Sequence, residues 1–118
     1  MTISGESIKN PKLRLAILLL AAGEGSRLGG FPKALLKNEG ESLLSRFLQS
    51  IQTLNPVETS VVTGFYADAV EAEINLIRQK TNNSVVIVKN PNPEKGQSSS
   101  VRIGLESLTS DFDLLLVA

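Results

Sequence analysis

The sequence of 118 residues contains neither cysteine nor histidine, and these two absences narrow its possible chemistry. Without cysteine it can form no disulfide framework and no thiolate metal site. Without histidine it lacks the commonest general base and the commonest metal ligand. Any chemistry must therefore use carboxylates, lysine, arginine, serine or backbone groups together with a metal ion. That inventory suits phosphoryl or nucleotidyl transfer, in which positioning and charge neutralisation provide most of the catalysis.

Charge of one sign and long apolar runs are also missing. Twelve basic and twelve acidic residues balance, which argues against a nucleic-acid-binding surface or a disordered acidic tail. No stretch of eighteen apolar residues exists, so no transmembrane helix is predicted. The apolar run over residues 13–22 follows basic residues, as in a signal peptide, but it is short and lacks a convincing cleavage site. We therefore expect a cytoplasmic protein.

Apolar segments and turn residues alternate along the chain, without internal repeats or low-complexity regions. Residues 1–12 are polar and are predicted to be a flexible leader, and the length that remains suits one small domain. Apolar runs predict strands at residues 13–21, 59–63, 85–88 and 114–117. Strands that alternate with helices predict an α/β fold, in which a parallel sheet is covered by helices on both faces.

Three helices are predicted between the strands. The first follows Ser42 as N-cap and ends at Asn55-Pro56, after a turn at residues 38–40. The second begins at a capping box of Asp68 and Glu71. The third spans residues 98–108, and the apolar residues expected to face inward are Val101, Leu105 and Leu108.

The most informative segment is the glycine-rich loop after the first strand, Leu-Ala-Ala-Gly-Glu-Gly-Ser-Arg-Leu-Gly-Gly-Phe-Pro-Lys at residues 20–33. Its four glycines let backbone N–H groups approach an anion without a Cβ in the way. Arg27 supplies a planar guanidinium and Lys33 a point charge, while Pro32 stiffens the chain before Lys33. The loop therefore predicts a polyphosphate-binding site.

The predicted topology also gives the location of the site. In open α/β sheets, ligands bind beyond the carboxyl ends of the strands. The loops at residues 22–32, 64–67 and 90–97 all follow strands, so we expect them to converge on one rim, where Ala118 also arrives. Asp111 and Asp113 precede the last strand and should lie at the opposite end, which excludes them as metal ligands of this site. Glu24 is expected to face solvent.

Two blocks carry a family resemblance. The first is LAAGEGSRLGGFPKALL at residues 20–36, and the second is Asn90-Pro91 followed by Gly-Gln-Ser-Ser-Ser-Val-Arg-Ile-Gly-Leu at residues 96–105. In this order they resemble the MobA-like nucleotidyltransferase superfamily, and within it the molybdenum cofactor cytidylyltransferase group. The resemblance covers residues 13–118. It implies a Rossmann-like three-layer sandwich with a mostly parallel sheet, of which this chain is the N-terminal, nucleotide-binding part, truncated after about the fourth strand.

The resemblance also assigns roles to individual residues. Backbone groups of Ala21, Ala22 and Gly23 would contact base and ribose, and Gly25 and Ser26 would face the phosphates. The two catalytic candidates would be Arg27 on the β- or γ-phosphate and Lys33 on the α-phosphate. The second block would add base or ribose contacts, with nucleotide-binding candidates Asn90, Gly96, Ser99 and Ser100. From the residues alone, Arg27 could instead be a solvated side chain, Asn90 an Asn-Pro turn, and one of the serines at 98–100 a helix cap.

The metal site is implied by the resemblance only. In that group the strand read here at residues 114–118 is followed by Gly-Asp, and the aspartate binds magnesium. We therefore expect the Mg²⁺ ligand just after Ala118, none within this chain, and a chain that is inactive alone.

The function implied is transfer of a nucleoside monophosphate to a phosphorylated small molecule such as molybdopterin, with release of pyrophosphate. The resemblance also bears on the base, because guanylyltransferases of the MobA type tend to have Ala-Gly-Gly where this sequence has Ala-Ala-Gly. The extra methyl group of Ala22 favours the smaller pyrimidine, and therefore CTP over GTP. Two other kinds of enzyme remain open, namely guanylyltransferases and nucleotidyltransferases of the sugar-phosphate or isoprenoid type. A non-catalytic alternative also remains open: a nucleotide-binding module or a maturation factor with a molybdoenzyme as client. Gly23, Gly25 and Gly29 also imitate an NAD(P)-binding fingerprint, but no acidic residue or arginine ends the second predicted strand. Neither nucleic acid nor a membrane is expected as a partner.

Overall fold

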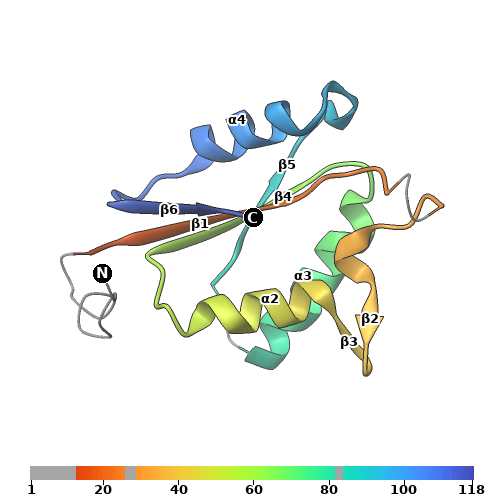
Figure 1. The fold of residues 1–118 in the computed structure, drawn as a ribbon, viewed down its shortest axis with the longest axis horizontal. Helices are drawn as coiled ribbons and strands as arrows, with labels where there is room; N and C mark the ends of the chain where they lie inside the picture. The colour runs from red at the N-terminus through yellow and green to blue at the C-terminus, as the bar shows by residue number, and fades with distance from the viewer. Residues whose placement is uncertain (1–12, 26–28, 82–83) are drawn as a thin grey trace, which may run out of the picture.

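The computed structural model describes residues 13–25, 29–81 and 84–118, so the predicted leader at 1–12 lies outside the described residues (Figure 1). The elements, in chain order, are β1 (Leu15–Ala21), η2 (Lys33–Leu35), β2 (Lys37–Asn38), β3 (Glu41–Ser42), α2 (Leu43–Gln52), β4 (Glu58–Thr63), α3 (Ala67–Thr81), β5 (Val86–Lys89), η3 (Pro93–Lys95), α4 (Gln97–Ser107) and β6 (Leu114–Val117). The four strands predicted from the apolar runs are therefore confirmed: the strand at 114–117 has the predicted ends, and the ends of the other three shift by at most two residues.

These four strands form one parallel sheet in the order β5-β4-β1-β6. β1 and β4 are central, and Ile17, Leu18, Val61 and Val62 on them have no exposed surface. Continuous apolar runs are typical of parallel strands that are covered on both faces. The sheet agrees with the predicted α/β fold.

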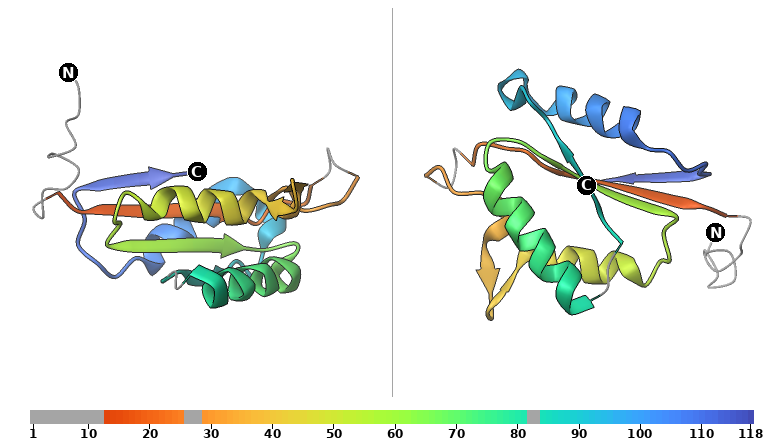
Figure 2. Two further views of the ribbon diagram at one scale, coloured as in Figure 1. Left: turned by 90° about the horizontal axis from the view of Figure 1, so that it is seen from below. Right: turned by 180° about the vertical axis from the view of Figure 1, so that it is seen from behind.

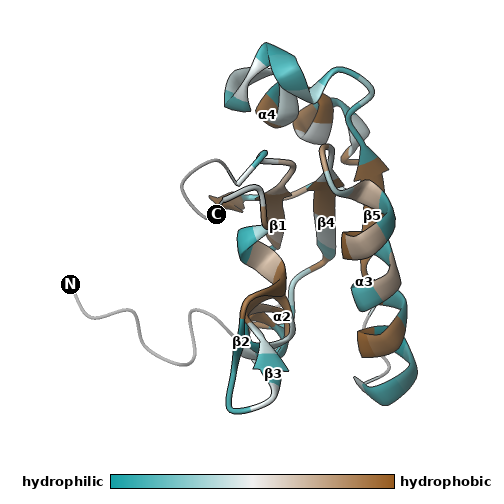
Figure 3. Ribbon diagram, turned by 90° about the vertical axis from the view of Figure 1, so that its right-hand side faces the viewer, coloured by the Kyte–Doolittle hydropathy of each residue, from teal (hydrophilic) through white to brown (hydrophobic). Residues whose placement is uncertain are grey.

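Helices cover both faces of the sheet. Figures 1 and 2 show α2 and α3 on one side and α4 on the other, which makes three layers. The larger apolar cluster lies under α2 and α3 and includes Ile17, Leu48, Val61 and Ile74. A smaller cluster of Leu18, Ala22 and Val62 lies on the α4 side. Figure 3 shows the hydrophobic strands in the middle of these layers.

The start of α2 follows the prediction. Ser42 caps the helix because its Oγ accepts a hydrogen bond of 3.0 Å from the amide of Ser45. The predicted turn at residues 38–40 is present, but it joins a short hairpin of β2 and β3 that was not predicted. Glu39 and Gly40 both have positive φ, 56° and 81°, which is the backbone geometry of a two-residue hairpin turn.

The predicted capping box of α3 does not form. The helix begins at Ala67, one residue before Asp68, so Asp68 lies in the first turn. The Glu71 carboxylate accepts a hydrogen bond from the hydroxyl of Thr63 at 3.3 Å. Glu71 therefore links α3 to the end of β4.

The inward face of α4 differs from the prediction. Leu105 is 41% exposed, whereas Ser99, Ser100 and Gly104 are buried. A Cβ at Gly104 would lie 2.4 Å from Cδ1 of Leu18, so only glycine allows the helix to approach the sheet this closely. The N-cap is Gly96, with φ 93°, rather than one of the serines. Among the described residues, no helix is both long and apolar enough to cross a membrane.

Candidate functional site

The loops that follow β1, β4 and β5 meet at the carboxyl ends of the strands. A Cβ on Gly64, after β4, would lie 2.7 Å from Cβ of Ala22 and 2.7 Å from Cβ of Pro93. The amide of Phe65 donates to the carbonyl of Ala22 at 3.4 Å, and the amide of Asn90 to that of Thr63 at 2.8 Å. The absence of a side chain on Gly64 therefore lets three loops pack together, and the predicted convergence on one rim is present.

A cavity of about 450 Å³ opens at this rim on the α4 side of the sheet. This α4-side cavity is large enough for a small-molecule ligand. Its lining includes four of the predicted site residues, Ala22, Gly23, Gly96 and Ser100. It also includes Glu24, which was expected to face solvent, and four residues that the sequence did not single out, namely Phe65, Pro93, Glu94 and Gln97.

A second cavity, also of about 450 Å³, lies at the same rim and contacts α2. The lining of this α2-side cavity includes Ala21, Gly25 and Lys33 together with apolar side chains of α2 such as Leu43 and Phe47. Leu20, Gly23 and Ala118 line both cavities. The two cavities therefore meet at the ends of β1 and β6, and a single ligand could occupy both.

The glycine-rich loop between β1 and η2 folds back on itself. The amide of Gly30 donates to the carbonyl of Gly25 at 3.0 Å. Gly25, Gly29 and Gly30 have φ of 67°, 68° and 85°, a region that L side chains rarely adopt. A Cβ on Gly25 would lie 2.1 Å from the carbonyl oxygen of Phe31. This fold requires glycine at position 25, while Ser26 and Arg27 lie outside the described residues.

Lys33 is the first residue of η2 and lies on the α2-side cavity. It follows Pro32, which is buried and extended, with φ −68° and ψ 123°. Lys33 is exposed, so its ammonium group can reach a ligand in that cavity.

The buried side chain of Asn90 connects the end of β5 to the start of α4 by hydrogen bonds. It is 1% exposed, and its Nδ2 donates to the hydroxyl oxygens of Ser99 and Ser100, each at 3.0 Å. Its Oδ1 accepts from the amide of Asn92 at 2.9 Å. These bonds fix the start of α4 and with it Ser100 on the cavity wall. A direct nucleotide contact by Asn90 or Ser99 stays a prediction, and support of the wall is the role that these bonds favour.

Carboxylates do not gather around a single point in the described part of the chain. No group of three or more acidic residues there could hold a metal ion. Glu24 is exposed, as expected, and lines the α4-side cavity with Glu94. Asp111 and Asp113 lie before β6 and within reach of Arg14, at the end of the sheet opposite to the rim. The carboxylates of the described residues therefore do not form a magnesium site on their own.

An aromatic pair at residues 65–66 was missed in the sequence. Phe65 is 43% exposed and lines the α4-side cavity, and Tyr66 bonds to the glycine-rich loop. The signal was available, because the chain has only five aromatic residues and two of them are adjacent in a loop expected at the rim.

Curated proteins with similar sequences are transferases and bifunctional proteins much longer than this chain. The chain is 36% identical over 107 residues to the bifunctional enzyme IspD/IspF of Clavibacter michiganensis, covering 88% of this chain and 25% of that protein. It is 31% identical over 121 residues to the bifunctional IPC transferase and DIPP synthase of Archaeoglobus fulgidus, covering 98% and 23%. The bifunctional protein GlmU of Acaryochloris marina is 41% identical over 61 residues, covering 51% and 13%. The chain therefore spans a quarter or less of these relatives.

Solved structures support the fold. The inositol-1-phosphate CTP transferase of T. maritima superimposes with a TM-score of 0.66 at 21% identity, covering 86% of this chain and 42% of that one. Rv0371c of Mycobacterium tuberculosis gives a TM-score of 0.66 at 26% identity, covering 89% and 52%. Both contain the Rossmann-like arrangement described here. The family model described as the MobA-like NTP transferase domain matches residues 17–118, and the chain therefore belongs to that family.

Proposed function

We propose that the protein transfers a nucleoside monophosphate from a nucleoside triphosphate, with CTP as the preferred donor, to a phosphorylated small molecule. The observation that carries this proposal is a glycine-rich loop at the carboxyl end of β1, with a cavity on each side of it. Base and ribose would occupy the α4-side cavity beside Ala22, Gly23 and Ser100. The triphosphate would cross Gly23 towards Gly25 and Lys33.

The chemistry follows from this placement. An oxygen of the acceptor's phosphate attacks the α-phosphorus in line, and the bond from that phosphorus to the bridging oxygen of pyrophosphate breaks. Lys33 would stabilise the negative charge that develops on the α-phosphate oxygens. Arg27 and the loop amides would hold the leaving pyrophosphate, as the family resemblance implies.

Magnesium would supply further charge neutralisation in such a reaction. The described carboxylates do not form a site for it. We propose that its ligand is an aspartate that follows Ala118 in the whole protein, and that the 118 residues alone do not turn over substrate.

The preference for CTP rests on the space around Ala22. This residue lines the α4-side cavity and is packed against Gly64, so its methyl group occupies room that a glycine would leave open. A smaller cavity favours a pyrimidine over a purine. GTP is therefore the second candidate donor.

Molybdopterin is the first acceptor to test, because the two sequence blocks resemble the molybdenum cofactor cytidylyltransferases. Sugar phosphates and isoprenoid phosphates are the next acceptors. The cytoplasm would be the site of action, with a molybdoenzyme as possible client and neither nucleic acid nor membrane as partner. Dinucleotide binding has less support, because β4 ends in Val62-Thr63 and is followed by Gly64, without an acidic residue for the ribose.

The experiment that tests the proposal measures pyrophosphate release by the full-length protein with Mg²⁺, each of the four nucleoside triphosphates, and each acceptor. We expect CTP with molybdopterin to give the fastest release. Fastest release with GTP would favour the guanylyltransferase alternative, and triphosphate binding without release would favour a non-catalytic module. The proposal would be overturned in favour of a dinucleotide-binding domain if NADH or NADPH raised the melting temperature of the protein and none of the four nucleoside triphosphates did.

A further inference from the structure

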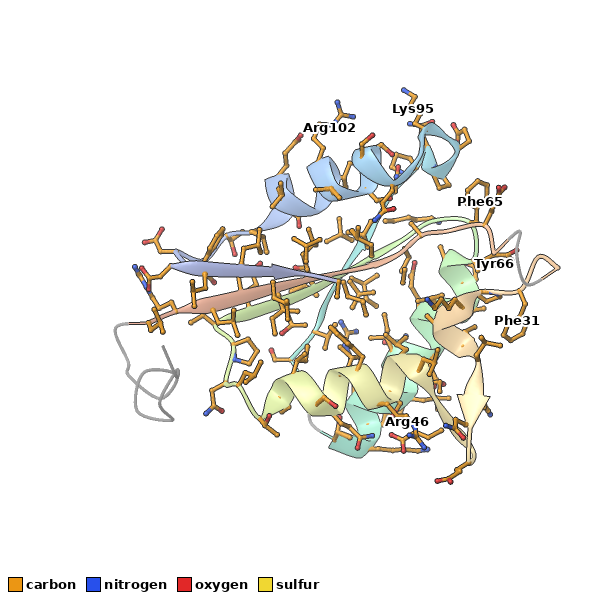
Figure 4. The ribbon with its side chains drawn as sticks, in the orientation of Figure 1. Phe31, Arg46, Phe65, Tyr66, Lys95 and Arg102 are labelled. Carbon is orange, nitrogen blue, oxygen red and sulfur yellow. The ribbon has the colours of Figure 1, made fainter. Side chains whose placement is uncertain are left out.

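Tyr66, in the loop between β4 and α3, holds both ends of the turn in the glycine-rich loop. Its hydroxyl oxygen lies 2.5 Å from the carbonyl oxygen of Glu24 and 2.5 Å from that of Gly30. Figure 4 shows Tyr66 at the rim, near Phe31 and Phe65. The carbonyls that it contacts flank the turn closed by the hydrogen bond from the Gly30 amide to the Gly25 carbonyl. A side chain from a distant part of the chain therefore closes the loop.

The side chain of Tyr66 is itself firmly held. Its ring is partly buried against the apolar cluster under α2 and α3. Its carbonyl accepts a hydrogen bond of 3.0 Å from the amide of Val70, in the first turns of α3. The hydroxyl is thus fixed by the core and by α3, and it can impose a position on the more exposed loop.

The contact also sets the direction of two backbone amides. In a trans peptide the C=O of one residue and the N–H of the next point in opposite directions. Because the carbonyls of Glu24 and Gly30 point to Tyr66, the N–H groups of Gly25 and Phe31 point away from it. Neither amide donates to another backbone group within the described part of the chain. Gly25 lines the α2-side cavity, where the proposed function places phosphates.

We propose that Tyr66 is a positioning residue that aims the backbone amide of Gly25, on the α2-side cavity, at the phosphates of the bound nucleotide. This inference rests on the proposed function. A hydroxyl has one hydrogen to donate, so the two carbonyls share it. Loss of the hydroxyl frees both carbonyls, and the peptides after Glu24 and Gly30 can then rotate. Phosphate binding weakens while binding of the nucleoside part, which uses other residues, is kept.

The test is Tyr66→Phe in the full-length protein, because it removes the hydroxyl and keeps the ring in the core. Titration calorimetry with CTP, cytidine and inorganic tripolyphosphate measures the effect. We expect the affinities for CTP and tripolyphosphate to fall about fivefold to tenfold, the size of one or two net hydrogen bonds. The affinity for cytidine, which has no phosphate, should change less than twofold. Thr53→Val is the matched control, since it removes a hydroxyl that donates to the carbonyl of Ser50 at the end of α2.

The outcomes separate the two proposals. If the unmodified protein binds no nucleoside triphosphate, the proposed function fails. If it binds CTP and Tyr66→Phe binds CTP equally well, the role of Tyr66 is overturned while the proposed function stands. An equal loss for CTP and cytidine would also overturn it, because general damage to the rim, rather than a lost phosphate contact, would then be the cause.

Discussion

The carboxylate of Asp113 binds the backbone and the side chain of Arg14 at once. Its Oδ2 accepts from the Arg14 amide at 2.8 Å and from Nε at 3.3 Å. One side chain thereby joins the start of β6 to the start of β1, at the end of the sheet opposite to the rim. The hydrogen bonds from the side chain and the backbone of Arg14 lower the pKa of Asp113, and the bond to Asp113 raises the pKa of Arg14.

Glu58 also joins two segments at this end of the sheet through its carboxylate. Burial raises the pKa of its carboxyl, but the hydrogen bonds from Ser110 and Thr109 outweigh that effect and lower it. The carboxylate accepts from the amide of Ser110 at 2.8 Å and from that of Thr109 at 3.1 Å. It thus fixes the segment between α4 and β6.

The lowered pKa values of Asp113 and Glu58 predict that the folded protein loses stability in acid. Both have a pKa in the folded protein below their ordinary values of 3.8 and 4.5, so their contribution is complete above those values and is lost as the pH falls through the folded pKa values. We expect the urea midpoint to decrease from pH 5 to pH 3. The double variant Asp113→Asn with Glu58→Gln should be less stable at pH 7 and should lose less on acidification. An unchanged slope in the variant would show that other groups cause the acid sensitivity.

The sequence predicted the strands and the layers well, because each depends on burial. Long apolar runs such as residues 15–21 have no stable place except in a covered parallel sheet. The inward face of α4 could not be predicted, since Leu105 is the more hydrophobic residue and yet Gly104 faces the sheet. Hydrophobicity ranks side chains, whereas the close approach of α4 to Leu18 selects for the smallest one. The short hairpin of β2 and β3 was missed because its strands have only two residues each.

The site was predictable to the extent that it lies in loops after strands. The convergence of the loops at one rim follows from the order of the strands. The hydrogen bonds from Asn90 to Ser99 and Ser100 could not be predicted from the sequence. A buried hydrogen-bond network depends on the orientation of side chains, which the spacing of residues does not encode. The link from Tyr66 to the glycine-rich loop joins segments about forty residues apart, and no local pattern reports such a pairing.

Gly64→Ala should destabilise the protein, because the new methyl group meets Ala22 and Pro93 at distances under 3 Å. Overpacking of this kind costs about 1–3 kcal/mol. Gly23→Ala is the stability control, since a Cβ at Gly23 meets nothing within 4 Å and should change the free energy of unfolding by less than about 0.5 kcal/mol. Urea denaturation of both variants measures the difference. Equal stability of the two would mean that the three loops can move apart without cost.

Asn90→Ala should also destabilise the protein, for a different reason. The substitution removes the donor shared by the hydroxyls of Ser99 and Ser100 and leaves a buried cavity. Loss of buried hydrogen bonds costs about 1–3 kcal/mol. Asn92→Ala is the control, because Asn92 is exposed and its hydrogen bond to Asn90 comes from its backbone amide, which the substitution keeps. If Asn90→Ala were as stable as the control, the buried network would carry no net stabilisation.

Lys33→Ala should reduce turnover by about a hundredfold to a thousandfold, the usual effect of removing one preorganised group that stabilises transition-state charge. Because Lys33 is exposed, the free energy of unfolding should change by less than about 0.5 kcal/mol. Lys37→Ala is the matched control, since Lys37 is also exposed but lies on β2, outside both rim cavities. Steady-state rates of pyrophosphate release by the full-length protein measure the effect.

If both lysine variants lost the same activity, net charge near the loop would explain the result. A role for Lys33 at the α-phosphate requires that only its own substitution lowers kcat, and that Lys33→Arg, which keeps the charge but changes its shape, restores only part of it.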